Sequence, residues 1–392
     1  MTQYILLNHI QVQNANAVAG FTWGFPAITH FLGFTHNLSR KLANNTGFDD
    51  ISLGGCAIIA HQHQVHTYQA SRDIEFLQSK NPPYMHGTAA AKLGDAPPII
   101  EEGKMNLTVS LLIAYDGNVG NRETSFTNWL KAICCRQRLA GGSIVSIKDI
   151  SLKTVESEQD VIRLNHLLLP GFILFDKSEY LAEYHSELLT QNTDSELLDA
   201  WLDFSRLKQR ARPKSNLIGK HLLDLLHQDS SNEIVNQLFE VWQEHLKQDV
   251  FSSEHIPQQL IEYFAGLPVG KHNKKLLQQW QHYCEPSNKT PADWNYVKRK
   301  HTGYLVPIMT GYKAISAKQE NNQVANTRDS ETDVCFVEAT HGIGLWCGIH
   351  KVNSPEVLEK SLWQYSYDEG NPHWYLCKQG LETDTPIEFE DF

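Results

Sequence analysis

The sequence lacks any long hydrophobic run. The longest apolar stretch, around residues 107–114, is broken by Thr108 and Ser110, whereas a membrane-spanning helix needs roughly 18–20 apolar residues. The first residues also carry neither a basic segment nor an apolar core of signal-peptide length. We therefore expect a cytoplasmic protein without a membrane partner.

Familiar catalytic motifs are also absent. The 392 residues contain no Gly-x-Ser-x-Gly, no His-Glu-x-x-His and no dinucleotide-binding Gly-x-Gly-x-x-Gly. The seven cysteines include no Cys-x-x-Cys pair, and the adjacent Cys134 and Cys135 are poorly placed for a disulfide. Reduced thiols are expected. These absences disfavour the common enzyme classes, and we expect no catalytic residue, metal ion or cofactor.

Positive charge is scarce overall but unevenly distributed. The formal net charge is −11, yet residues 1–150 carry 11 Lys and Arg against 10 Asp and Glu. Five acids lie in the last eleven residues, which predicts an acidic tail over 381–392. Because phosphate binding needs only a local basic stripe, the net acidity does not exclude nucleic acid.

Small basic groups do occur. They are Arg40-Lys41, the pair Arg136 and Arg138, the run Arg206, Lys208, Arg210, Arg212 and Lys214, and Lys298-Arg299-Lys300. For the run after Ser205, a solvated helix end and a contact with nucleic acid or an acidic partner both remain open.

Alternating and helical patterns predict an α+β core in the first half of the chain. Strands are predicted over 3–12, 54–68, 107–115 and 142–150, and helices after Pro26 and over 123–138. In the first helix the apolar residues Ile28, Phe31, Leu32, Leu38 and Leu42 recur at helical spacing. The order β-α-β-β-α-β is the ferredoxin-like arrangement shared by RNA-recognition-motif-like folds. A further strand is predicted over 167–175.

The rest of the chain divides by composition. Residues 69–104 form a long proline-containing loop within a core that spans 1–180. Residues 181–297 are poor in proline and read as a mostly helical insert, in which Leu238 and Trp242 recur at helical spacing. Residues 298–380 become rich in strand patterns again, and we expect this segment to pack back on the core.

Two segments offer chemistry suited to RNA. The segment Gln13–Ala17, with Gln13, Asn14 and Asn16, and the aromatic segment Thr22–Pro26 follow the first strand; amides read base edges and aromatic rings stack on bases. The alternative is that the asparagines cap turns and the aromatics pack in the core. The Gly141-Gly142-Ser143 sequence after Arg138 would cradle a phosphate or form a plain helix-to-strand turn.

The histidines at 61, 63 and 66 form the densest titratable cluster. On a strand, His61 and His63 would share one face, with His66 on the other. A metal site, acid–base work on RNA, and solvated or base-stacking side chains are the open interpretations. No Asp, Glu or Cys lies within the segment to complete a metal site.

Several motifs in order carry a resemblance to a known family. They are the segments Gln11–Ala17, Thr22–Pro26, Arg138–Ile144, Leu168–Phe172, Leu305–Ile308 with Gly311-Tyr312, Arg328–Thr332 and Phe336–Glu338. Together they resemble the Csy-two family, the Cas-five-type (RAMP) subunit of the type I-F CRISPR-Cas surveillance complex, also called the Csy or Cascade complex. The matches run from about residue 4 to 375, and the middle, about 185–297, is longer and more helical than the family pattern.

The resemblance implies a non-catalytic, RNA-binding subunit of an antiviral ribonucleoprotein. Such subunits hold the 5′ handle of the CRISPR RNA, pair with the large Csy-one-type subunit and abut a backbone Csy-three-type subunit. The assembly recognises target double-stranded DNA by guide pairing. The loop 69–104 would be the family's thumb, with basic residues at Arg72, Lys80, Lys92 and Lys104.

The two lines of reasoning give one set of expected RNA-binding residues: Gln13, Asn14, Asn16, Thr22, Trp23, Phe25, Arg40, Arg138, Gly141, Gly142, Ser143 and Arg328. For Arg328, an ion pair with Asp329 or Glu331 is an equal alternative. Two other functions stay open: an endoribonuclease that processes CRISPR precursor RNA with the strand histidines, and a protein–protein adaptor without RNA contact.

Overall fold

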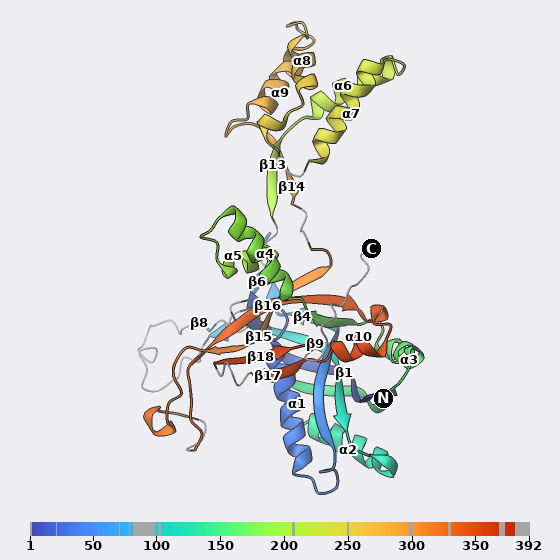
Figure 1. Ribbon diagram of the computed structural model, residues 1–392, viewed down its shortest axis with the longest axis vertical. Helices are drawn as coiled ribbons and strands as arrows, with labels where there is room; N and C mark the ends of the chain where they lie inside the picture. Colours follow the sequence, from blue (N-terminus) through green and yellow to red (C-terminus); the bar gives the residue numbers. More distant parts are fainter. Residues whose placement is uncertain are drawn as a thin grey trace. The chain divides into compact units, whose positions relative to one another are not determined.

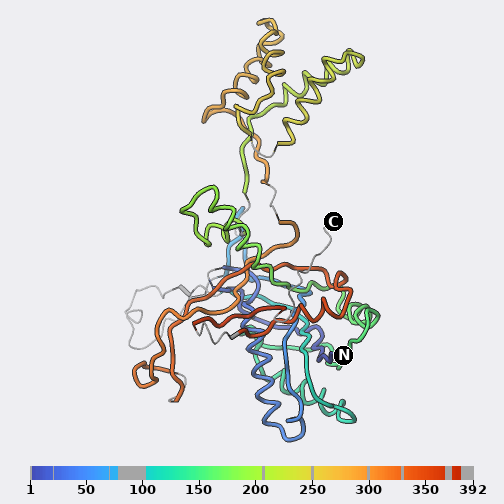
Figure 2. The backbone as a smooth tube through the Cα atoms, viewed as in Figure 1, coloured from blue at the N-terminus to red at the C-terminus, as the bar shows by residue number. Residues whose placement is uncertain are grey.

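The chain forms two compact units. In the computed structural model, unit 1 comprises Met1–Phe204 with His301–Phe392, and unit 2 comprises Ser205–Lys300 (Figure 1). The structure describes residues 2–20, 22–69, 71–77, 79–80, 99–100, 103–205, 208–248, 251–297, 301–327, 331–367 and 373–380. Two segments that are distant in sequence thus build unit 1, as the path of the chain in Figure 2 shows.

Unit 1 is built on a ten-stranded sheet whose neighbouring strands are all antiparallel. In spatial order its strands are β10 (Arg138–Leu139), β11 (Gly142–Val155), β1 (Thr2–Asn16), β9 (Lys104–Asp116), β4 (Ser52–Val65), β12 (Phe172–Asp176), β16 (Val337–Gly348), β15 (Tyr304–Ala314), β18 (Trp374–Lys378) and β17 (Gln364–Tyr367). Strands from the returning segment therefore extend the same sheet, and the protein is α+β as predicted.

The six elements predicted for the first half are present in the predicted order. Strands β1, β4, β9 and β11 are joined by the helices α1 (Ile28–Ala43) and α2 (Glu123–Cys134). All five apolar residues that predicted α1 are buried. Helix α2 ends at Cys134 rather than at 138, because Arg138 and Leu139 pair with β11 as a short strand.

The strand predicted over 167–175 is wrong in its first half. Residues Glu158–Leu168 form the helix α3, and only Phe172–Asp176 form the strand β12. A capping box between Ser157 and Asp160 begins α3, and such reciprocal bonds satisfy backbone N–H groups that a helix start otherwise leaves free. The Pro170-Gly171 pair then separates helix from strand.

The sheet of unit 1 has a core on each face. Alternate residues of β1 point to opposite sides: Ile5 and Leu7 pack with α1 and α2, whereas Tyr4 and Leu6 pack with α3. On the α3 side, the cluster also includes residues of α5 (Leu197–Ser205) and α10 (Pro355–Lys360), with α4 (Glu179–Gln191) packed against it. Beyond the reach of α3, the same face of β11, β1, β9 and β4 is open.

Short strand pairs and single turns complete unit 1. The pairs are β2 (Val18–Ala19) with β3 (Thr22–Trp23), β5 (Thr67–Tyr68) with β6 (Glu75–Phe76), and β7 (Ser79–Lys80) with β8 (Ile99–Ile100). The 3-10 turns are η2 (Gly120–Arg122), η4 (Asn321–Gln323) and η5 (Ile349–Lys351). The tail predicted over 381–392 lies outside the described residues.

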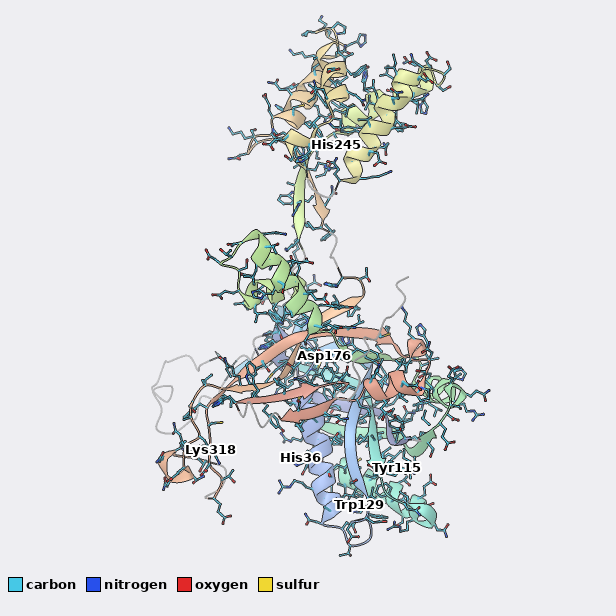
Figure 3. All side chains as sticks on the ribbon, viewed as in Figure 1. His36, Tyr115, Trp129, Asp176, His245 and Lys318 are labelled. Atoms are coloured by element: carbon cyan, nitrogen blue, oxygen red, sulfur yellow. The ribbon has the colours of Figure 1, made fainter. Side chains whose placement is uncertain are left out.

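Unit 2 has its own hydrophobic core. Its elements are β13 (Gln209–Pro213), α6 (Asn216–Gln228), α7 (Glu233–Lys247), η3 (Ser253–His255), α8 (Gln258–Ala265), α9 (Lys274–Cys284) and β14 (Ala292–Tyr296). Leu222, Trp242 and Phe264 are buried in one cluster, and His245, labelled in Figure 3, donates to or accepts from the Tyr283 hydroxyl at 3.0 Å.

The sequence predicts a helical insert that starts at residue 181, whereas unit 2 starts at Ser205. Helices α4 and α5 precede it and pack on unit 1: Trp201 and Phe204 lie in the core on the α3 side, and the Trp201 indole donates to the Gly342 carbonyl at 3.2 Å. In the described part of the chain, no helix is both long and apolar enough to cross a membrane.

Candidate nucleic-acid interface

An uncharged polar surface covers the open face of four strands. Register places Ser146, Gln11, Thr108 and Gln62 in one row across β11, β1, β9 and β4. Directly paired residues of antiparallel strands point to the same face. The neighbouring row holds Ser143, Gln13, Asn106 and Gln64, and most of these residues line a shallow hollow of about 220 Å³. We call these eight residues the amide face.

The amide face presents donors and acceptors without charge. Gln11, Gln13, Gln62 and Gln64 are exposed, and the Ser146 hydroxyl donates to the Gln11 carboxamide oxygen at 2.9 Å. Carboxamides both donate and accept hydrogen bonds, as the edges of bases do. The predicted residues Gln13 and Ser143 belong to this surface. The other six were missed, although polar residues at alternate positions of the predicted strands 54–68 and 107–115 were a usable signal for Gln62, Gln64 and Thr108.

Two stacked histidines lie where the amide face meets the region covered by α3. The rings of His9 and His61 are 3.9 Å apart with an interplanar angle of 17°. His61 Nδ1 is 2.9 Å from the Pro170 carbonyl, which only accepts, so Nδ1 carries a proton. His61 Nε2 lies 2.7 Å from the Ser110 hydroxyl oxygen, and that hydroxyl donates to Asn8 Oδ1 at 3.2 Å. His9 Nδ1 then donates to Asn8 Oδ1 at 2.7 Å.

Burial favours the neutral form of both rings. Burial lowers the pKa of His61 below its usual value. The hydrogen bond to the Pro170 carbonyl raises this pKa, and the positive charge of Lys148 lowers it. Burial also lowers the pKa of His9, and the positive charges of a protonated His61 and of Lys148 lower it further. The His9 Nε2 atom remains an acceptor beside the amide face.

The prediction that His61 and His63 share a face is wrong. A register shift between Ala60 and Gln62 inserts His61 as an extra residue, which breaks the alternation of β4. His61 therefore bonds Ser110 on the amide side, whereas His63 is opposite Leu107, which belongs to the core under α1 and α2. Among the described residues, no three His, Cys, Asp or Glu side chains gather closely enough to hold a metal ion.

An aromatic pocket of about 490 Å³ borders the free edge of β4. Trp23 and Phe25, both predicted for binding, line it with Phe172, Tyr304 and Trp346. Phe172 and Tyr304 are 52% and 71% exposed, which leaves ring surface available. The last three residues come from distant segments, so no local sequence pattern could have found them.

The two predicted aromatics are held firmly. Trp23 stacks on Phe76 with ring centroids 3.7 Å apart, and Phe25 stacks on Phe31 at 5.3 Å and meets Trp346 edge-on at 4.8 Å. Each is half-buried. One side of each ring therefore packs against other aromatic rings, while the pocket opens beside it. Binding by these two rings stays a prediction.

The polar residues around these aromatics hold the backbone. The Asn16 carboxamide oxygen accepts from Val18 N–H at 3.0 Å, an Asx turn, and the Thr22 hydroxyl donates to the Ala19 carbonyl at 2.9 Å. Asn14 has a positive φ of 55° in a β-bulge, and its N–H donates to the Asn106 carboxamide oxygen at 3.4 Å. Turn formation, the alternative reading of the asparagines, therefore describes Asn16.

The glycine segment forms a hairpin between strands, not a helix-to-strand turn. Arg138 pairs with Ser143, and the two turn residues, Ala140 and Gly141, both have positive φ, as a type I′ turn requires. A side chain at Gly142 would come within 2.6 Å of the Gln13 carbonyl oxygen, so β10–β11 approaches β1 through a glycine. Arg138 and Gly141 are exposed at this rim.

The remaining predicted residues are scattered. Arg40 is exposed in the last turn of α1, which covers the face of the sheet opposite the amide face. It lies about 18 Å along the helix from Ile28, the first residue of α1. Arg72 is exposed before β6, and Lys104 is half-buried at the start of β9. Lys80 lies in β7, and its side chain is outside the described residues, as are Lys92 and Arg328.

Comparison with known proteins points to one family. A family model described as "CRISPR-associated protein (Cas_Csy2)" matches residues 5–227 and 273–377. The chain is also 26% identical over 389 residues to CRISPR-associated protein Csy2 of Pseudomonas aeruginosa (strain UCBPP-PA14), with 94% of each chain covered. The unmatched residues 228–272 fall within unit 2. The chain belongs to the Csy2 family of CRISPR-associated proteins, of the type I-F system.

Proposed function

We propose that the chain is a non-catalytic structural subunit that binds CRISPR RNA and holds its 5′ handle. The amide face is the observation that carries this proposal: an open sheet surface of eight uncharged polar side chains. An aromatic pocket opens at the edge of β4, toward the α1 and α2 side of the sheet, since Met105 and Leu107 line it. Sequence-specific RNA recognition uses unstacked bases, which hydrogen-bond through their edges and stack on aromatic rings.

The order of the strands supports the same proposal. Strands β11, β1, β9 and β4 are neighbours in that order, and α1 and α2 cover their other face. A ferredoxin-like core has this antiparallel order, and RNA-recognition folds bind RNA on the sheet face opposite the helices. We propose that residues 1–180 are such a core.

Phosphate contacts are proposed at the rim of the amide face. Arg138 and the open backbone of Gly141 lie at the β10–β11 hairpin, while Arg72 and Lys104 belong to the proposed thumb. Phosphate contacts fix the position of a nucleic acid and make its affinity salt-dependent. The large Csy-one-type subunit, a Csy-three-type backbone subunit and target double-stranded DNA, recognised through the guide, are the proposed partners.

The histidines favour a scaffold over an endoribonuclease. Both ring nitrogens of His61 are within hydrogen-bonding distance of protein atoms, and Ser110 has no exposed surface. His63 is exposed and His66 is half-buried, so RNA cleavage would have to proceed from one of these two histidines. Intact precursor RNA after incubation with the purified chain is the expected result, and cleavage that His63→Ala abolishes would establish the enzyme instead.

The amide face is tested by co-purification. The chain is expressed with the large subunit and a CRISPR RNA, and retained 5′ handle is quantified for wild type and for the Gln13→Ala/Gln62→Ala double variant. Because each lost base contact costs about 1–3 kcal/mol, we expect at least a tenfold loss of retention at raised salt. Gln191→Ala, exposed in α4, is the matched control. Unchanged retention in the double variant rules out the amide face, and no RNA with wild type favours the adaptor.

A further inference from the structure

His9 occupies a strained backbone position at the border of the amide face. Between Leu7 and Ile10, two residues of β1 oppose the single residue Ser110 of β9, so His9 belongs to a β-bulge. Its φ of 50° lies in the left-handed region, which glycine adopts most readily. Glycine would relieve this strain but would place no side chain here. A histidine at such a position therefore indicates that the imidazole ring itself has a use.

One atom of the His9 ring is a fixed acceptor that no described protein group uses. His9 Nδ1 donates to Asn8 Oδ1 at 2.7 Å, so Nε2 of the neutral ring keeps its lone pair. The ring stacks on His61 with centroids 3.9 Å apart, which holds the direction of that lone pair. In the described part of the chain, the buried nitrogens that lack a partner, such as His30 Nδ1, do not include His9 Nε2. This atom therefore reaches solvent beside the amide face.

The surroundings of His9 favour its neutral form. Burial lowers the pKa of His9, and the positive charges of a protonated His61 and of Lys148 lower it further. On β11, Asp149 pairs with the residue before His9 and Lys148 follows it in register. On β9 the neighbour is Ser110, which does not titrate. The ring is therefore an acceptor at any pH above about 6.5, the ordinary pKa of histidine.

A fixed acceptor selects a ligand that donates. The carboxamides of the amide face both donate and accept, so they adapt to either kind of group. Neutral His9 with its Nδ1–H committed to Asn8 offers only an acceptor. RNA has two kinds of donor, the N–H groups on base edges and the 2′-hydroxyl of ribose. A phosphate group carries acceptor oxygens and fits this atom poorly.

We propose that His9 Nε2 accepts a hydrogen bond from an N–H or O–H donor of the handle RNA and is a specificity-determining residue of the amide face. This inference rests on the proposed function, to which it adds a residue that the sequence did not suggest. The contact needs a neutral ring, because a protonated Nε2 would present a donor to a donor. RNA binding through His9 should therefore weaken on acidification, whereas a cationic contact with phosphate would strengthen.

The test measures the affinity of the full chain for labelled handle RNA by fluorescence anisotropy between pH 8 and pH 5. At pH 8, His9→Phe keeps a ring beside His61 but removes the acceptor, and it should weaken binding about fivefold, the value of one hydrogen bond. His9→Gln has a carboxamide oxygen that accepts and does not titrate, so it should keep most of the affinity. Wild type should lose affinity relative to His9→Gln as the pH falls. His36→Phe, exposed on α1, is the matched control and should behave as wild type.

Substituted RNAs identify the donor. Each handle nucleotide is replaced in turn by its 2′-deoxy form and, in a second series, by an abasic one. The replacement that removes the donor should make His9→Phe silent, since two groups in contact do not contribute independently. A silent pair in the deoxy series identifies the 2′-hydroxyl, and one in the abasic series alone identifies a base N–H. A full effect of His9→Phe on every substituted RNA would overturn the direct contact.

The remaining outcomes also decide the question. Unchanged affinity of His9→Phe, or equal losses in His9→Phe and His9→Gln, would leave His9 a structural role only. An affinity of wild type that rises more steeply on acidification than that of His9→Gln would assign the ring to phosphate. If His9→Phe no longer melts cooperatively, the pH dependence of wild type against His9→Gln decides. Gln13→Ala/Gln62→Ala is measured alongside: its unchanged affinity refutes the amide face, whereas its loss with an unaffected His9→Phe refutes the His9 contact alone.

Discussion

His9 and His61 show how single residues fix the protonation state of the proposed interface. The Pro170 carbonyl can only accept, so the Nδ1–H of His61 must donate to it, while His61 Nε2 lies 2.7 Å from the Ser110 hydroxyl oxygen. A second proton on either ring would place a partly buried cation against the stacked neighbour, 3.9 Å away. The native packing of this pair therefore favours neutral rings.

This linkage predicts a pH-dependent stability of unit 1. Because burial lowers the folded-state pKa of His61 below its unfolded value near 6.5, the unfolded chain binds more protons between the two values. The contribution to stability is complete above pH 6.5 and is lost as the pH falls below it. We expect the melting temperature to fall between pH 7 and pH 5, and His61→Gln to make that fall smaller. His36→Gln, exposed on α1 and labelled in Figure 3, is the control; an equal pH slope in wild type and His61→Gln would contradict the linkage.

At the scale of elements, periodicity predicted what regular packing determines. Ile28, Phe31 and Leu42 repeat at helical spacing because one side of α1 is buried, and the alternating strands followed in the same way. Bulges obey no period. The extra residues at His9 and His61 reverse which side chains reach each face, so the amide face could not be assembled from alternation alone.

Capping of α7 gives a prediction for one element of unit 2. The Asn232 side chain accepts from the N–H groups of Ile234 and Val235 at 3.1 and 3.4 Å. Loss of such a cap costs about 1 kcal/mol. Asn232→Ala should therefore speed hydrogen exchange in α7 about fivefold, measured by mass spectrometry. Ser215, at the start of α6, makes no capping bond with its side chain, so Ser215→Ala should change exchange in α6 little. Equal effects would mean that the cap bonds contribute nothing.

At the scale of the whole molecule, the two compact units depend on contacts between segments that are far apart in the sequence. Residues 181–204 share the helical character of unit 2, yet Trp201 and Phe204 are buried against unit 1. Which core a helix joins depends on contacts with residues far away in sequence. The aromatic pocket illustrates the same limit, since Trp23, Phe172 and Tyr304 meet only after the returning segment extends the sheet.

The path of the chain at the boundary makes unit 2 removable. The rings of Phe204 and His301 are 5.8 Å apart, and His301 stacks on Tyr180 at 4.0 Å, so the chain leaves and re-enters unit 1 at neighbouring points. Six flexible residues span up to about 20 Å, enough to join 204 to 301. Unit 1 without residues 205–300 should therefore fold, with the thermal transition of its own core preserved.

This deletion tests whether the amide face acts without unit 2. The shortened chain keeps the amide face and the aromatic pocket, so it should still retain handle RNA when co-expressed with the large subunit. Loss of handle RNA from a shortened chain that still melts cooperatively would show that RNA binding needs unit 2.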